Sequence, residues 1–257
     1  MRSVALLSVV IPTLNEAERI AQTVQRVLDI SDGEVDLIVA DGGSSDGTPQ
    51  LAEPLARVLE APRGRARQMN AGAAVARGTH LLFLHADTLL PANAFARIHS
   101  VLRDPNVAAG LFRLQFDTDR PLYRLYAAVT AIPWHRIAFG DRALFMRRTA
   151  FDRAGGFPDQ PILEDIDLVR RLRQFGRIEF APESVITSAR RFERSGPLRQ
   201  QLVNMALWGA HLAGVSPDRL AYFYRARSET ASGPVPPGSE TAAHAPDSDH
   251  SKASSQP

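Results

Sequence analysis

The chain has 257 residues, of which 44% are hydrophobic, with 30 basic residues, 28 acidic residues and no cysteine. This length and composition suffice for one large α/β domain with a buried core, and the lack of cysteine excludes disulfides and thiolate-ligated metals. No apolar stretch approaches the roughly 20 residues of a membrane span, and the run after Arg2 lacks a signal-cleavage site. We therefore expect a cytoplasmic protein, free or resting at the inner face of the cell membrane.

Residues 228–257 differ in composition from the rest of the chain. They are mainly Ser, Pro, Gly, Ala, Asp and Glu without an aromatic residue, and they cannot bury enough surface to offset chain entropy. We expect a disordered tail here, after a folded domain of residues 1–227. The tail holds four acidic residues and one lysine, so the domain carries a net charge of +5. That charge is weak support for nucleic-acid binding, and without a nucleic-acid motif no such partner is expected.

Alternating strand and helix patterns begin the chain. Short apolar runs followed by polar or glycine-containing turns predict three strands, at Ala5–Ile11, Val35–Ala40 and Leu81–Leu84. Helices are predicted after the capping-box spacing Thr13-Leu-Asn-Glu16, within residues 48–58 and within residues 68–77. Strands and helices at this spacing imply right-handed crossovers and a mainly parallel sheet flanked by helices, which is a single-domain α/β fold.

Polar side chains follow each predicted strand, where open parallel sheets bind their ligands. They are Thr13, Asn15 and Glu16 after the first strand, Asp41 after the second, and His85 and Asp87 after the third. Neither a dinucleotide-binding glycine motif nor a P-loop is present. The segment Asp41–Gly47 is either an ordinary glycine-rich turn or a turn that offers Asp41 to a base or ribose.

The segment His85-Ala86-Asp87 is a candidate metal site with a single hard carboxylate. Mg²⁺ or Mn²⁺ held by one carboxylate, water and substrate phosphates needs no further protein ligand. Alternatively, His85 and Asp87 cap the helix region that follows. The histidines show no H-x-x-x-H spacing, which argues against zinc.

Asp165 stands just before a helix predicted over residues 166–176 and falls on the apolar face of that helix. It is either a catalytic base or a buried cap, since the helix dipole favours a carboxylate at this end and also weakens it as a base. Arginine-rich segments at 63–65 and 188–196 suit a diphosphate or form solvated basic loops. A helix over residues 198–215 is either a core helix, the favoured reading, or an interfacial one.

Together these segments resemble the family-2 glycosyltransferases over about residues 7–225. The motifs that carry the resemblance are Ser8-Val-Val-Ile-Pro-Thr-Leu-Asn-Glu16, Ala40-Asp-Gly-Gly-Ser-Ser-Asp-Gly-Thr48, His85-Ala-Asp87 and Glu164-Asp165, in that family's order. Within the family the chain resembles a subgroup linked to arsenosugar biosynthesis and radical-SAM gene neighbourhoods. That closer likeness lies in the segments 64–72, 82–88, 155–157 and 187–191.

The resemblance implies a GT-A fold and a metal-dependent, inverting hexosyl transfer from a nucleotide-diphosphate sugar, with a UDP-sugar favoured. The acceptor would be a small molecule, a lipid or a carotenoid-like acid, and peripheral membrane association would fit a lipid. A non-catalytic nucleotide-sugar-binding protein is the alternative.

The resemblance also assigns roles to particular residues. Asp165 would deprotonate the acceptor beside Glu164, and Asp87 would bind Mn²⁺ or Mg²⁺. Two departures stand out, since His85 replaces the first Asp of the broader D-x-D motif and Arg142 stands where Gln is expected. The predicted donor site comprises Pro12, Thr13, Asn15, Glu16, Asp41, Arg65, Asn70, His85, Ala86, Arg190 and Arg191.

Overall fold

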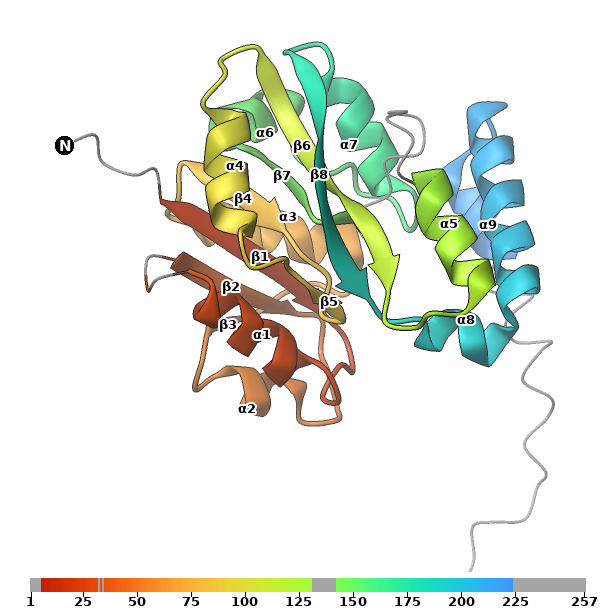
Figure 1. Ribbon diagram of the computed structural model, residues 1–257, viewed down its shortest axis with the longest axis horizontal. Helices are drawn as coiled ribbons and strands as arrows, with labels where there is room; N and C mark the ends of the chain where they lie inside the picture. The colour runs from red at the N-terminus through yellow and green to blue at the C-terminus, as the bar shows by residue number, and fades with distance from the viewer. Residues whose placement is uncertain (1–5, 32, 34, 131–141, 224–257) are drawn as a thin grey trace, which may run out of the picture. The chain divides into compact units, whose positions relative to one another are not determined.

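Eight strands form one mixed sheet in the computed structural model, which describes residues 6–31, 33, 35–130 and 142–223 (Figure 1). The described residues up to Ala221 belong to one compact unit. The order across the sheet is β3-β2-β1-β4-β7-β6-β8-β5. In chain order the strands are β1 Leu7–Thr13, β2 Val35–Asp41, β3 Arg57–Glu60, β4 His80–Phe83, β5 Thr88–Leu89, β6 Val107–Phe116, β7 Leu144–Arg147 and β8 Arg177–Thr187.

The first half of the sheet is parallel and the second half is mixed. β1 lies between β2 and β4 and runs parallel to both, and β3 pairs in parallel with β2. β7 is antiparallel to β4 and β6, while β6 and β8 are parallel and β5 is antiparallel to β8. The predicted α/β fold, with a sheet flanked by helices, is confirmed.

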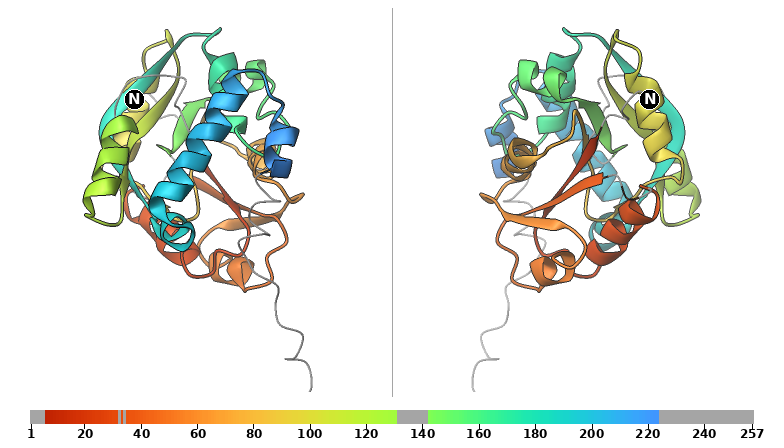
Figure 2. Two further views of the ribbon diagram at one scale, coloured as in Figure 1. Left: turned by 90° about the vertical axis from the view of Figure 1, so that its right-hand side faces the viewer. Right: turned by 90° about the vertical axis from the view of Figure 1, so that its left-hand side faces the viewer.

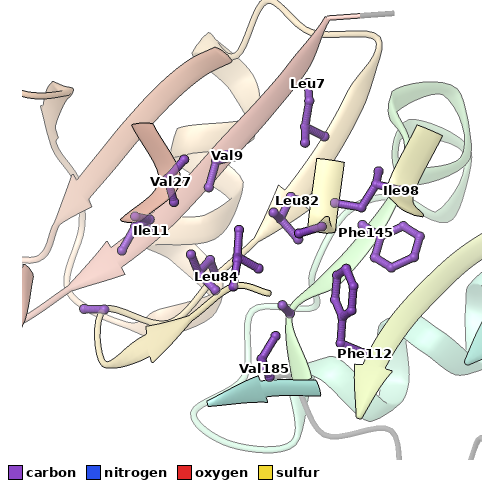
Figure 3. Close-up of a cluster of buried hydrophobic side chains, with 14 of the residues drawn as sticks. Leu7, Val9, Ile11, Val27, Leu82, Leu84, Ile98, Phe112, Phe145 and Val185 are labelled. Atoms are coloured by element: carbon purple, nitrogen blue, oxygen red, sulfur yellow. The ribbon is translucent and has the colours of Figure 1, made fainter. Parts of the chain in front are cut away.

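Helices cover both faces of the sheet (Figure 2). On one face, Leu7, Val9 and Ile11 of β1 pack with α1 and α4 (Figure 3). On the other face, Val10 and Ile38 pack with α3, and the same core extends to α6 and α7. The helices are α1 Ile20–Asp29, α2 Thr48–Ala52, α3 Arg65–Val75, α4 Ala94–Leu102, α5 Pro121–Thr130, α6 Arg148–Ala154, α7 Glu164–Leu172, α8 Arg190–Ser195 and α9 Pro197–Leu212.

The capping-box prediction at Thr13 is wrong. Thr13 is the last residue of β1, and its hydroxyl donates to Asp41 Oδ1 at 3.0 Å. α1 therefore begins only at Ile20, without a side-chain cap. The helix predicted within residues 48–58 ends early at Ala52, because residues 57–60 form β3 at the edge of the sheet.

The favoured core reading of the helix over residues 198–215 is also wrong. In α9, Leu198, Leu202 and Met205 are 65%, 68% and 56% exposed, and Leu212 is exposed as well. Among the described residues, the buried member of α9 is the polar Gln200. No helix in the described part of the chain is long and apolar enough to cross a membrane.

Candidate active site

The loops after β1 and β2 are tied to each other at the carboxyl edge of the sheet. Asn15, with a positive φ of 56°, accepts the Ser45 backbone N–H at its Oδ1 (2.9 Å), while its own N–H donates to Ser44 Oγ (2.8 Å). The Glu16 N–H donates to Thr48 Oγ1 at 2.8 Å. Asn15 therefore orders this edge, and these bonds bring Glu16 beside the β2 loop.

Asp41 is a buried organiser of its own loop. Its Oδ2 accepts the N–H groups of Gly43 and Ser44 at 2.9 and 2.8 Å, and its Oδ1 accepts the hydroxyls of Thr13 and Ser44. The turn-forming alternative thus describes what its carboxylate does in this structure. Gln68 was missed by the sequence reasoning: its amide donates to the carbonyls of Thr13 and Ala40 and joins the ends of β1 and β2.

Asp87 is placed by the short β5–β8 ribbon. Thr88 pairs with Thr187 across the ribbon, their hydroxyls lie 2.9 Å apart, and the Ser188 N–H donates to the Asp87 carbonyl. This pairing brings the arginine-rich segment after β8 to the carboxyl edge of the sheet. The N-cap of α4 is Asn93, so the alternative that His85 and Asp87 cap this helix is wrong.

Arg190 joins the arginine-rich segment to the β1 loop. Its NH2 donates to Glu16 Oε2 at 2.9 Å, and its NH1 donates to Glu18 Oε2 at 2.7 Å. Burial raises the pKa of Asp87, while the charges of Arg190 and Arg19 oppose that rise. Burial also raises the pKa of Glu16, and the Asp87 charge adds to the effect.

Asp87 and Glu16 are the candidate protein ligands for a divalent cation on this edge. The Asp87 charge helps to raise the pKa of Glu16, a bound cation would oppose that rise, and substrate phosphates would complete its coordination. Among the described residues there is no group of three or more His, Asp or Glu that could hold a metal ion. A small pocket beside Asp87 is lined by further polar groups that the sequence reasoning did not single out, namely Arg19, Gln22 and Asp117.

A second acidic pair lies at the start of α7. Glu164 is fully buried and Asp165 is 5% exposed, as predicted for an acid on the inner face of this helix. Arg65, from the first turn of α3, donates from Nε to Glu164 Oε1, and its NH2 lies 3.5 Å from Asp165 Oδ2. The structure thus places Arg65 with the candidate base.

Other predicted site residues have different surroundings. The Asn70 amide donates to the Phe157 carbonyl and accepts the Phe157 N–H, so it holds the loop before α7. Arg142 is fully buried, and its Nε donates to the Phe112 carbonyl at 2.9 Å. Arg191 belongs to α8, but its side chain is outside the described part of the chain.

The remaining predicted positions lie along the same edge. Pro12 is half-buried in β1, and Ala86 is buried with its carbonyl accepting the Thr23 hydroxyl. His85 is half-buried between β4 and β5. The tail expected from Ser228 lies outside the described residues.

Comparison with known proteins defines the class. Residues 8–158 match the family described as Glycosyl transferase family 2, and the chain belongs to this family. A PGL/p-HBAD biosynthesis glycosyltransferase of Mycobacterium tuberculosis is 32% identical over 156 residues, which cover 52% of this chain and 61% of the relative. Glycosyltransferase GlyG of Streptococcus pneumoniae is 24% identical over 128 residues, covering 46% of this chain and 42% of that protein. The chain thus spans less than two thirds of the length of either relative.

Solved structures share the fold, which is the GT-A fold of glycosyltransferases. The mannosyltransferase PcManGT from Pyrobaculum calidifontis, in complex with GDP-Man and Mn²⁺, aligns with a TM-score of 0.59 and 23% identity over 72% of this chain and 57% of its own. S. aureus TarS 1–349 in complex with UDP-GlcNAc aligns with a TM-score of 0.58 and 16% identity, covering 71% of this chain and 58% of its own.

Proposed function

We propose that this protein is an inverting glycosyltransferase that moves a sugar from a nucleotide-diphosphate donor to an acceptor hydroxyl. One observation carries the proposal: a family-2 chain places an arginine on acidic residues at two points, Arg190 on Glu16, whose pKa the Asp87 charge helps to raise, and Arg65 on Glu164 and Asp165. A single displacement needs two such groups, one to neutralise the departing diphosphate and one to take the acceptor proton.

The donor side is formed by the loops after β1 and β2 and by the segment after β8. Asp87, with Glu16 beside it, would hold Mn²⁺ or Mg²⁺, and the bound cation would neutralise charge on the leaving diphosphate. Arg190 binds the carboxylates of Glu16 and Glu18, and on donor binding it would exchange them for phosphate oxygens of the diphosphate. We assign the nucleotide to the loop edge that Asn15 and Asp41 hold in place. A UDP-sugar is the expected donor, while GDP-Man and UDP-GlcNAc occur in the structural relatives.

Asp165 is the proposed base. As the acceptor oxygen attacks the anomeric carbon, Asp165 takes the hydroxyl proton, and the bond from the anomeric carbon to the phosphate oxygen breaks with its electrons on the diphosphate. One displacement inverts the anomeric centre, so an α-linked donor gives a β-linked product. We place the chain in the subgroup linked to arsenosugar biosynthesis on its segments 64–72 and 187–191.

We also propose that the protein docks on a lipid surface through α9. Leu198, Leu202, Met205 and Leu212 recur at helical spacing on the solvent side and form one stripe, with Gly209 between the last two. α9 contains no acidic residue, and the exposed Arg199 borders the stripe, which suits an anionic membrane. A lipid acceptor would then be met at that surface.

Product analysis tests the activity. The purified protein is incubated with a cell extract, Mn²⁺ and a panel of labelled nucleotide sugars, and products are identified by mass spectrometry. We expect one labelled product whose formation stops when EDTA removes the metal. Tight donor binding without transfer or donor hydrolysis would favour a non-catalytic nucleotide-sugar-binding protein, the second candidate.

A further inference from the structure

The start of α7 directs two consecutive acids inward. Leu163, at the N-cap position, has a positive φ of 63°, and Glu164 and Asp165 follow it as the first helical residues. A leucine in this backbone region is strained, and such strain persists where the surrounding structure demands it and often marks functional sites. The result is a buried acidic pair at the carboxyl edge of the sheet.

One guanidinium serves both acids. Arg65 Nε donates to Glu164 Oε1, while Arg65 NH2 lies 3.5 Å from Asp165 Oδ2. Glu164 Oε2 has no hydrogen-bond partner among the described residues, and the other oxygen of this fully buried carboxylate accepts its hydrogen bond from Arg65. Leaving such a charge unpaired is strongly destabilising.

The two contacts are unequal. The hydrogen bond from Nε fixes the Arg65 guanidinium on Glu164, and a second nitrogen of the same group then faces Asp165 at ion-pair distance. Asp165 is therefore oriented by a group that is itself anchored. A base must lie within hydrogen-bond reach of the proton that it abstracts, and an error of about 1 Å can cost about 100-fold in rate.

We propose that Arg65 is a positioning residue for the Asp165 base, anchored by Glu164, and that it does not bind the donor diphosphate. The proposal rests on the proposed function, and it replaces the donor-side role that the sequence resemblance suggests for Arg65. Glu164 is then the anchor of Arg65, and the three residues act as one unit.

Steady-state kinetics on Arg65 variants tests this assignment. Arg65→Gln should lower kcat by about 10- to 100-fold, since the base loses its orientation. Its donor Kd, measured by calorimetry, should stay within about twofold of wild type, because no donor contact is lost. Arg65→Lys, which keeps the charge but not the fork, should recover part of the loss. Arg67→Gln is the matched control, because Arg67 lies on the same helix and pairs with the exposed Asp159.

A double variant keeps the test valid if Arg65→Gln unfolds. Arg65→Gln with Glu164→Gln removes both partners of the hydrogen-bonded pair and should fold, because the fully buried Glu164 charge is removed together with the arginine that stabilises it. Its kcat should still be low, since Arg65 no longer orients Asp165. A donor Kd that weakens as much as kcat/KM, with normal kcat, would overturn the proposal and return Arg65 to the diphosphate. A normal kcat in the folded double variant would overturn it too. A wild-type protein without transfer activity would refute the proposed function itself.

Discussion

At the scale of single residues, Asp87 on the donor side carries a buried charge that lowers the stability of the folded protein. Burial raises the pKa of Asp87 even though Arg190 and Arg19 oppose the rise. Asparagine has the same shape and no charge to bury. We therefore expect Asp87→Asn to melt at a slightly higher temperature than wild type at neutral pH without ligand, and to lose Mn²⁺-dependent donor binding.

The pH dependence of that difference has a definite sign. A carboxyl whose folded pKa is raised costs no stability below its unfolded pKa, where it is protonated in both states; the cost builds as pH rises from the unfolded pKa and is complete above the folded pKa. The melting difference between wild type and Asp87→Asn should accordingly shrink as the pH falls toward the ordinary Asp value of 3.8. Thermal melts over this range check it, and a variant less stable than wild type at neutral pH would contradict it.

Asp165 combines burial with a position in the first turn of a helix. Asparagine is nearly isosteric but cannot take a proton, so Asp165→Asn should keep the fold and the donor affinity. A positioned base contributes on the order of 10²- to 10⁴-fold in rate, and kcat with a hydroxyl acceptor should fall within that range. Transfer assays and calorimetry on one preparation give both values. Near-normal turnover would refute the base role, and a collapse of thermal stability would favour a buried structural role.

At the scale of elements, α3 packs unusually close to β1. A Cβ added at Gly72 would lie 2.3 Å from Val10 Cγ1, whereas one added at Gly209 of α9 meets no atom within 4 Å among the described residues. Overpacking costs about 1–3 kcal/mol, while alanine gains about 1 kcal/mol over glycine in a helix. Gly72→Ala should therefore destabilise the protein and Gly209→Ala should stabilise it by up to about 1 kcal/mol. Urea unfolding of both variants measures the two signs, and equal shifts would contradict the packing argument.

Several elements that bury apolar runs were predicted, although the buried strands β6 and β7 were not. β2 begins at Val35 and α7 buries Asp165 as the local patterns predict. Elements buried on one face repeat their apolar residues with the period of the strand or helix. β3 was missed since its residues are half-buried or exposed and form no apolar run. The start of α1 was wrongly predicted at Thr13 because the Thr13 hydroxyl bonds to Asp41, 28 residues away, and a local sequence pattern does not predict that contact.

The same limit applies to the candidate site. The sequence predicted Glu16, Asp41 and Asp87 on one edge of the sheet, because the carboxyl ends of parallel strands meet at the same edge. The Arg65 contact to Glu164 joins positions 99 residues apart, and composition alone left Arg65 between a phosphate site and a solvated loop. The contact of Arg65 with two consecutive acids could not be predicted from the sequence, because it depends on how α3 and α7 pack together.

At the scale of the whole molecule, α9 contacts the helix that carries the candidate base. His211 of α9 lies 3.4 Å from Asp167, which follows Asp165 by two residues on α7. Tyr126 of α5 donates to the Pro197 carbonyl at the start of α9. The side of α9 opposite the stripe therefore contacts α5 and α7. A surface that binds the stripe would lie on the outer side of α9.

Vesicle binding tests the stripe on α9. Wild-type protein should sediment with vesicles that contain anionic phospholipid, and binding should weaken in high salt because basic residues near a membrane contribute about 1 kcal/mol each. Leu202→Gln with Met205→Gln should abolish sedimentation without lowering the melting temperature, since both side chains are exposed in the folded protein. Leu51→Gln is the control, because Leu51 is an exposed leucine on α2, away from the stripe. Light scattering tests whether the stripe instead binds a second copy of the chain. If wild type forms a dimer that the double substitution dissociates, and wild type does not bind vesicles, the stripe is a dimer contact and membrane docking is refuted.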